Sequence, residues 1–382
     1  MEPIGEEQAF VYVEGRKLRR GYTTGTSAAA AAGAAARLLL TGAAPPYMRI
    51  LTPKGIDVAV EVVSAEATQD CARASVRKDG GDDADDTNGA EICAEVSRIP
   101  EGFEVDGGRG VGRVTRRGLD QPEGNAAINH VPRQMIADAL RDAAAAAGYG
   151  GGLKAVITVP EGEAIARKTF NPRLGIVGGI SILGTSGIVE PMSETALLGS
   201  IKAEMKVFMA QGRKYLLTVP GNYGKDFAKA YPGLEGDTPV ECSNFIGDFL
   251  DMAVEMGAEG VLLVGNLGKL VKVAGGIMNT HSRNADARME ILASNAVMAG
   301  ADAETAKRIM GCISTDDALE VLAEKGLIGP TMDILIPKIE FHMQHRVRGS
   351  IATAAVVFST EFGILGETTS AKALLAKVEA KE

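Results

Sequence analysis

The clearest sign of architecture is the stretch GVLLVGNLGK at residues 260–269. Its apolar first half, Gly260–Val264, is typical of a strand buried on both faces, and it runs directly into a glycine-containing turn. An earlier apolar run, Tyr215–Val219, predicts a second strand, and the pattern over Phe245–Met256 predicts an amphipathic helix. A strand, a helix and a strand in this order predict a parallel pair joined by a crossover.

Outward from this unit, the C-terminal part is expected to be mainly helical and to close with a strand at Ile351–Phe358. The helices are expected near Ala285–Ala299, Ala303–Gly311, Asp316–Lys325 and Thr331–Val347.

The N-terminal part mixes the two element types. Thr and Ser residues at 22–27 precede an alanine-rich segment, which predicts a helix to about Leu40 with a stop at Thr41-Gly42. The other elements expected here are strands at Met48–Leu51, Val58–Val63 and Ala155–Val159, and a helix at about Pro132–Ala147.

The 382 residues exceed the size at which single cores usually divide, so two domains are expected. We predict an α/β protein with a glycine-rich α+β domain at 1–200 and an α/β domain with a parallel strand–helix–strand unit at 201–382. The strand at 351–358 either ends the second sheet or returns to the first domain.

Composition excludes several classes of protein. The net charge is -9, aromatic residues make up only 4% and tryptophan is absent, which argues against nucleic-acid binding. The four cysteines are scattered and predict reduced thiols, with no metal site. The acidic N-terminus and the short apolar run Ala28–Leu40 predict a cytoplasmic protein without a membrane span.

Glycine is abundant, with 47 residues, 17 of them between Gly102 and Gly187. At the helix start, residues 18–27, hydroxyls and glycines beside Arg19 and Arg20 suit a carboxylate or phosphate, although Thr24 or Thr26 could simply cap the helix. The acidic loop at 78–89 would bind a cation or a hydroxyl-rich ligand, or is a solvated turn.

Two more glycine-rich segments follow. Residues 107–115 contain Gly-x-Gly-x-Gly, which is weaker than a dinucleotide fingerprint and equally suits a glycine-rich hairpin. The segment 168–192 would let a ligand touch its backbone, with Glu190 and Ser193 as hydrogen-bonding groups, or its glycines serve strand-to-turn packing.

The turn that follows the strand at 260–264 lies where open α/β sheets bind ligands, and Lys269 and Lys272 favour an anion there. His281 stands in a polar loop and is the best acid–base candidate, although a lone histidine is more often structural. No catalytic triad or phosphate-binding loop is present.

In their order along the chain and in their amino-acid sequences, these segments resemble the cobalt-precorrin-5B C(1)-methyltransferase family of anaerobic cobalamin biosynthesis. The strings that carry the resemblance are LRRGYTTGTSAAAAA (18–32), KDGGDDADDTNG (78–89), GVGRVTRRGL (110–119), AINHVPRQMI (127–136), KTFNPRLGIVGGISILGTSGIVEPMSE (168–194), SNFIGDFLDMA (243–253) and GNLGKLVKVAGGIMNTHSRNADARMEIL (265–292). The chain departs from the family pattern at Ser27, Asn266 and Ser186, where cysteine, histidine and threonine are expected. These departures argue against an obligatory cysteine at 27 and an essential base at 266.

The resemblance implies methyl transfer from S-adenosylmethionine to carbon 1 of cobalt-precorrin-5B, which gives cobalt-precorrin-6A, and a fold unlike that of the other corrin-ring methyltransferases. Cobalt enters only as part of the substrate. The implied partners are a cobalt-corrinoid intermediate and neighbouring pathway enzymes, while the oligomeric state stays open. The alternative is a non-catalytic protein that binds the corrinoid and hands it on.

The segments supply the expected site. His281, Asp286 and Glu190 are the candidates for catalysis. The residues expected to bind substrate or methyl donor are Arg19, Arg20, Thr23, Thr24, Gly25, Thr26, Asp82, Asp83, Gly108, Gly110, Gly112, Gly179, Ser181, Gly184, Thr185, Ser186, Gly187, Gly265, Lys269, Lys272 and Arg283. The substrate carries several carboxylates, so we expect a locally positive cleft. Its expected cations are Arg19, Arg20, Lys269, Lys272 and Arg283. The 107–112 loop and the 178–190 turn are expected to line the cleft where methyl donor and ring meet.

Overall fold

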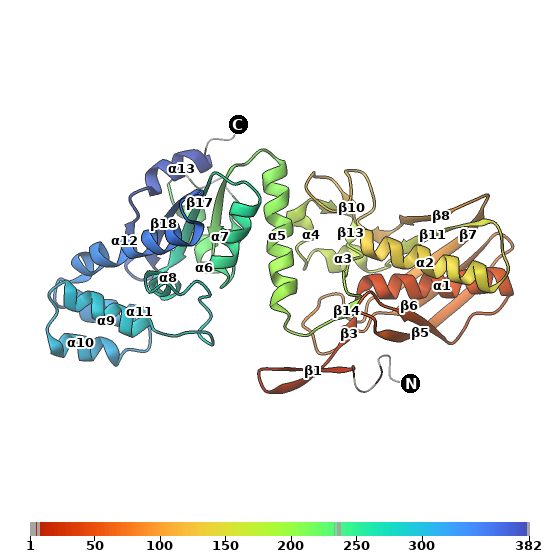
Figure 1. Ribbon diagram of the computed structural model, residues 1–382, viewed down its shortest axis with the longest axis horizontal. Helices are drawn as coiled ribbons and strands as arrows, with labels where there is room; N and C mark the ends of the chain where they lie inside the picture. Colours follow the sequence, from red (N-terminus) through yellow and green to blue (C-terminus); the bar gives the residue numbers. More distant parts are fainter. Residues whose placement is uncertain (1–4, 6–7, 233, 235–237, 380–382) are drawn as a thin grey trace. The chain divides into compact units, whose positions relative to one another are not determined.

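The computed structural model describes residues 5, 8–232, 234 and 238–379. The chain divides into two compact units, Met1–Ala196 and Leu197–Glu382, each with its own hydrophobic core (Figure 1). The expected α/β class is confirmed, since the first unit contains a mainly antiparallel sheet and the second a mainly parallel one.

A six-stranded sheet of order β4-β5-β6-β7-β11-β8 forms the base of the first unit. Only the β11–β8 pair is parallel. The strands are β4 (Tyr47–Leu51), β5 (Asp57–Ala67), β6 (Cys71–Arg77), β7 (Glu91–Ile99), β8 (Phe103–Gly107) and β11 (Gly152–Thr158). On β7, Ile92, Ala94 and Val96 are fully buried and alternate with more exposed residues, as expected for a sheet covered on one face.

Helices α1 (Thr24–Thr41) and α2 (His130–Ala146) lie side by side over this sheet (Figure 1). Every residue of α1 from Thr24 to Ala36 is buried, so the small alanine side chains let the helix pack closely on all sides. Gly42, with φ +77°, ends α1 in the left-handed conformation. The predicted helix and its stop are therefore confirmed.

Short strand pairs tie distant segments of the first unit together. They are β1 (Phe10–Val13) with β2 (Arg16–Arg19), β3 (Gly21–Tyr22) with β14 (Ile188–Val189), β9 (Gly110–Val111) with β13 (Gly179–Ile180), and β10 (Arg113–Val114) with β12 (Ile176–Val177). Two short helices, α3 (Gly162–Ala166) and α4 (Asn171–Leu174), lie between them in sequence. The interpretation of residues 107–115 as a hairpin is wrong, because β9 and β10 each pair with a separate later strand.

The second unit is built on a sheet of order β16-β15-β17-β18-β19, parallel except for β19. The strands are β15 (Tyr215–Val219), β16 (Val240–Glu241), β17 (Gly260–Asn266), β18 (Ala352–Ser359) and β19 (Gly363–Glu367). The strand expected at 351–358 is β18, and it pairs with β17 in this sheet.

Helices cover both faces of the second sheet. One face packs against α6 (Asn222–Ala230) and α13 (Ala371–Glu379). The other packs against α7 (Ile246–Glu255), α8 (Leu267–Ala274) and α12 (Ile328–Val347). The remaining helices are α5 (Glu194–Ala210), α9 (Arg288–Met298), α10 (Ala303–Met310) and α11 (Thr315–Ala323).

All predicted strands and helices are present, with ends shifted by a few residues, and the four cysteines are free thiols as expected. The sequence analysis missed β6, β7 and β8 in the first sheet, β16 and β19 in the second sheet, and helices α5, α6, α8 and α13. None of the helices in the described residues combines the length and the apolar character needed to cross a bilayer.

Candidate functional site

The start of α1 is held by its own hydroxyl groups. Thr23 is the N-cap, and its side chain accepts a hydrogen bond of 3.3 Å from the backbone N–H of Thr26. The Thr26 hydroxyl donates to the carbonyl of Gly187 at 2.7 Å, and Ser27 donates to the carbonyl of Thr23 at 3.1 Å. The cap is therefore Thr23, one residue before the threonines considered from the sequence.

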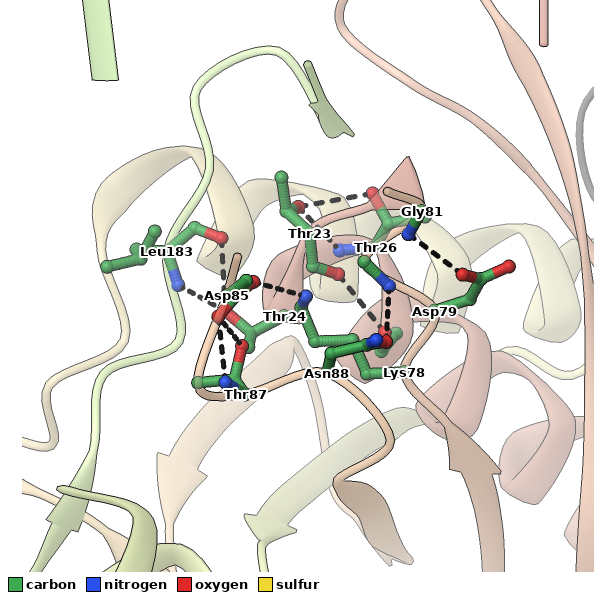
Figure 2. A network of polar contacts seen from close by, with 12 residues as sticks. Thr23, Thr24, Thr26, Lys78, Asp79, Gly81, Asp85, Thr87, Asn88 and Leu183 are labelled. Carbon is green, nitrogen blue, oxygen red and sulfur yellow. Dashed lines mark hydrogen bonds and ion pairs between the residues drawn. The ribbon is translucent and has the colours of Figure 1, made fainter. Parts of the chain in front are cut away.

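The turn at residues 183–187 closes over this helix start (Figure 2). The hydroxyl of Thr24 accepts from the N–H of Leu183 at 2.9 Å, and the N–H of Gly25 donates to the carbonyl of Leu183 at 3.1 Å. A Cβ on Gly184 would lie 2.5 Å from the side chain of Thr23. Donors that an incoming anion would use are thus engaged within the protein, and a ligand role for these residues stays a prediction.

The acidic loop lies against the strand that leads into α1. Asp79 forms a bidentate ion pair with Arg19 at 2.5 and 2.7 Å, and Asp82 accepts the backbone N–H of Arg19 at 2.7 Å. Asp83 accepts the N–H of Met192 at 3.0 Å. Burial opposes ionisation of Asp79, but the bonds from Arg19 and a neighbouring N–H outweigh it and lower its pKa.

Inside the same loop, Lys78 forms an ion pair of 2.6 Å with Asp85, and the lysine side chain is 1% exposed (Figure 2). Asp85 also accepts two bonds from Thr87. Although burial opposes its ionisation, the lysine lowers the pKa of Asp85. The interpretation as a solvated turn is therefore confirmed only in part. Asp82 and Asp86 are exposed, whereas ion pairs of Asp79 with Arg19 and of Asp85 with Lys78 hold the loop in place.

Glu190 is shared by two cations. It accepts from Arg20 at 3.1 Å and pairs with Lys54, whose hydrogen bond is the main cause of its lowered pKa. Arg20 also donates to the carbonyl of Gln8 at 3.0 Å. Glu190 is thus an ionised carboxylate in a bridge, an arrangement that makes it a weak general base.

Gly110 and Gly179 meet backbone, because β9 and β13 pair directly. A Cβ on Gly110 would overlap the carbonyl oxygen of Val159, and one on Gly179 would overlap Gly110. A Cβ on Gly112 would lie 2.3 Å from the side chain of Ile176. Internal packing is a sufficient reason for these three glycines.

The remaining predicted residues of this region differ in exposure. Ser181 is buried and donates to Asn171 at 3.2 Å, while Ser186 donates to the carbonyl of Ile188 at 2.9 Å. Thr185 is exposed. A Cβ on Gly108 would lie 2.6 Å from the Thr158 side chain.

In the second unit, the neighbouring strands β15 and β17 lead into helices on opposite faces of the sheet. The helix after β15 is α6, on one face, and the helix after β17 is α8, on the other. In open α/β sheets, ligands bind outside the carboxyl ends of the strands at this kind of switch point. We call the loops that follow β15 and β17, residues 220–222 and 266–269, the sheet-edge site.

Lys269 is the cation of the sheet-edge site. Its ammonium group donates to the carbonyl of Pro220 at 2.5 Å, and burial lowers its pKa. Gly221 has φ +145° and ψ -173°, a conformation that essentially only glycine adopts. Asn266 caps α8 by accepting the N–H of Gly268 at 2.8 Å. The site thus presents one cation and the starts of two helices.

Gly265 and Lys272 have structural contacts nearby. A Cβ on Gly265 would overlap the side chain of Leu270. Lys272 is 2% exposed, and its ammonium group donates to the carbonyls of Thr280 and Ala285 at 3.1 and 2.8 Å. Lys272 therefore fastens the 277–287 loop to α8.

His281 and Asp286 lie in that loop. The Nδ1 atom of His281 accepts the N–H of Arg283 at 3.1 Å, so a neutral imidazole carries its proton on Nε2 and offers a donor. Asp286 forms a bidentate pair with Arg288 at 2.6 and 3.0 Å, which lowers its pKa. Neither group is poised as a base in this arrangement.

The predicted cations fall in different units. Arg19 and Arg20 belong to the first unit, while Lys269, Lys272 and the exposed Arg283 belong to the second. Sequence reasoning missed Gly221, which follows the predicted strand 215–219 in the string VPGNYG. The sequence feature that could have indicated Gly221 is the Pro-Gly pair directly after a buried strand. It was overlooked because no helix was expected there.

The sequence matches two family models, one described as CbiD over residues 11–191 and one as CbiD, C-terminal domain, over residues 279–369. A Ruminiclostridium cellulolyticum protein named cobalt-precorrin-5B C(1)-methyltransferase is 46% identical over 352 residues, 92% of each chain. A Thermoanaerobacter protein of the same name is 47% identical over 84% of this chain and 87% of its own.

Among solved structures, the crystal structure of a cobalamin biosynthesis protein (cbiD) from Archaeoglobus fulgidus is 32% identical. The match covers 73% of this chain and 88% of that one, with a TM-score of 0.40.

Proposed function

The chain belongs to the CbiD family, and we propose that it transfers a methyl group to carbon 1 of cobalt-precorrin-5B, the reaction for which its relatives are named. The observation that carries this proposal is the 46% identity over 92% of both chains. The substrate is accordingly a corrinoid, and its cobalt belongs to the substrate. The expected product is cobalt-precorrin-6A.

We infer that the methyl donor is S-adenosylmethionine and that it binds at the sheet-edge site. The donor carries a carboxylate, which suits the ammonium group of Lys269 and the starts of α6 and α8. Gly221 leaves the turn open, since a Cβ there would meet only the Lys269 ammonium group, at 3.9 Å. The topology of the sheet supports the same place.

The chemistry needs no nucleophile from the protein. Carbon 1 of the ring supplies the electron pair that forms the new carbon–carbon bond, while the methyl–sulfur bond breaks and the sulfonium leaves as a thioether. Catalysis then consists of holding the two reactants in line and excluding water. The engaged states of Glu190, Asp286 and His281 agree with a reaction that depends on positioning.

The decisive experiment is anaerobic incubation of the protein with cobalt-precorrin-5B and S-adenosylmethionine labelled in its methyl group, followed by mass analysis. We expect one labelled methyl group in the corrinoid and one equivalent of S-adenosylhomocysteine. A corrinoid that binds but stays unlabelled would instead support the corrinoid-handover function. The Lys269→Met variant, assayed at limiting donor concentration, then tests the donor site separately.

A further inference from the structure

A strongly cationic stretch of the first unit lies outside the sheet-edge site. Residues 107–119 and 164–189 contain seven arginine and lysine residues and no aspartate or glutamate, in a chain whose net charge is -9. The seven are Arg109, Arg113, Arg116, Arg117, Arg167, Lys168 and Arg173. We call the surface they form the cationic platform.

The fold brings the two segments together. They are joined by the β9–β13 and β10–β12 pairs, which lie near α3 and α4 (Figure 1). The hydroxyl of Thr115 donates to the carbonyl of Gly175 at 2.6 Å, and the guanidinium of Arg116 donates to the carbonyl of Arg173 at 3.2 Å. Arg116 and Arg173 are therefore neighbours although 57 residues separate them, and the strand pairs bring together the two segments that carry the other five cations.

Most of these charges lack a carboxylate partner. Arg113 pairs with Asp106 at 3.0 Å, just outside the first segment. Within the described residues, no salt bridge to a carboxylate involves the exposed side chains of Arg109, Arg116, Arg117, Arg167 and Lys168. So many unneutralised cations repel one another, which favours an anionic ligand with several negative groups.

The same segments also expose apolar surface. Phe170 is 42% exposed and Val177 is 60% exposed, and the Arg173 guanidinium lies 5.8 Å from the centre of the Phe170 ring. Apolar side chains among cations suit a flat ring with carboxylates on its rim. A small inorganic anion would contact the cations but not the apolar side chains.

We propose that the cationic platform binds the carboxylate side chains of the corrinoid substrate. This inference rests on the proposed function, and it assigns the carboxylates of the ring to a surface of the first unit. Charge–charge attraction at exposed groups is screened by salt, so the contribution of the platform falls as ionic strength rises.

The test compares two corrinoid probes that differ in charge: cobyrinic acid, a polycarboxylate, and cobinamide, in which the carboxylates are amidated. Their dissociation constants are measured by calorimetry at low salt for the wild type, Arg116→Gln/Arg117→Gln and Arg16→Gln/Lys17→Gln. The last variant loses two exposed cations of the same unit outside the platform. We expect about tenfold weaker cobyrinic acid binding in the platform variant alone, with cobinamide binding unchanged.

A second variant, Arg167→Gln/Lys168→Gln, removes the other half of the platform, so a folding defect in the first variant does not block the test. Equal losses in the platform and control variants, or unchanged cobyrinic acid binding in both platform variants, would overturn the proposal. Methyl transfer by the wild type is assayed separately. If the platform variants lose cobyrinic acid binding selectively but the wild type transfers no methyl group, the proposed function is overturned. The proposal that the platform binds corrinoid carboxylates is then still supported.

Discussion

Gly110 of the first unit and Gly221 of the second serve opposite purposes. In the first unit, Gly110 and Gly179 let two backbones touch, and a Cβ on Gly110 would overlap the carbonyl oxygen of Val159. In the second unit, Gly221 adopts a backbone conformation that essentially only glycine reaches, and a Cβ there would find open space up to Lys269. Gly110 thus marks closed packing, whereas Gly221 marks an open turn. Of these two positions, only Gly221 leaves room for a ligand.

The largest effect that tests this contrast is expected from Gly110→Ala. Both Gly110 (φ +74°) and Gly178 (φ +85°) adopt left-handed conformations, but nothing lies within 4 Å of a Cβ on Gly178. We expect Gly178→Ala to lower the free energy of unfolding by about 1–2 kcal/mol, the backbone cost alone. Gly110→Ala adds a backbone clash and should cost about 4 kcal/mol or prevent folding. Equal losses in denaturant titrations would contradict close packing at Gly110.

The next largest effect concerns the acidic loop. Asp85→Asn leaves the buried ammonium group of Lys78 without its carboxylate, and we expect a loss of about 3 kcal/mol in the free energy of unfolding. The matched control is the exposed Asp86→Asn, which should change stability little. The double variant Lys78→Met/Asp85→Asn should recover part of the loss.

The pH dependence of this pair follows from the lowered pKa of Asp85. The ionised carboxylate stabilises the fold above its unfolded-state pKa, and this stabilisation is lost as pH falls through the lower folded-state value. Acid titration of unfolding should therefore be steeper for the wild type than for Asp85→Asn. Identical slopes would mean that the pair does not hold the loop.

The contrast between the units also explains what the sequence could predict. The helix at Thr24–Thr41 and the strands at 215–219 and 260–266 are predictable because composition and local periodicity report on burial. The pairing of β9 with β13 depends on segments far apart in the chain, which local patterns do not reveal. The strands β6 and β7 were missed although apolar and polar residues alternate along both, because several of the apolar positions are alanines, which have a low β propensity.

Site residues show the same limit. Clustered glycines and hydroxyls in the first unit predict ligand binding. A count of residue types, however, does not show which atoms these glycines and hydroxyls contact in the fold. Lys269 and Lys272 look equivalent in the sequence, and only the structure separates the sheet-edge cation from the lysine that fastens a loop.

These two lysines on α8 provide a smaller, sharper test. Lys269→Met should weaken S-adenosylmethionine binding about tenfold, the effect of losing one charge-assisted hydrogen bond, with the melting temperature nearly unchanged. Lys272→Met removes donors to the carbonyls of Thr280 and Ala285 and should instead lower the melting temperature. Calorimetric titration and thermal unfolding of both variants distinguish the roles, and a reversed pattern would move the donor site away from Lys269.

The smallest expected effect is the pH dependence of Lys269, whose pKa is lowered by burial. The pKa of Lys269 is therefore lower in the folded protein than in the unfolded chain. Between these two pKa values, the free energy of unfolding of the wild type rises with pH relative to that of Lys269→Met. Donor affinity must move the opposite way, because the carboxylate needs the protonated ammonium group. If the free energy of unfolding rises and the donor affinity falls over the same pH interval, one group causes both changes. A group remote from the donor would change only the free energy of unfolding. Affinity that stays constant over that interval would exclude Lys269 as the donor's cation.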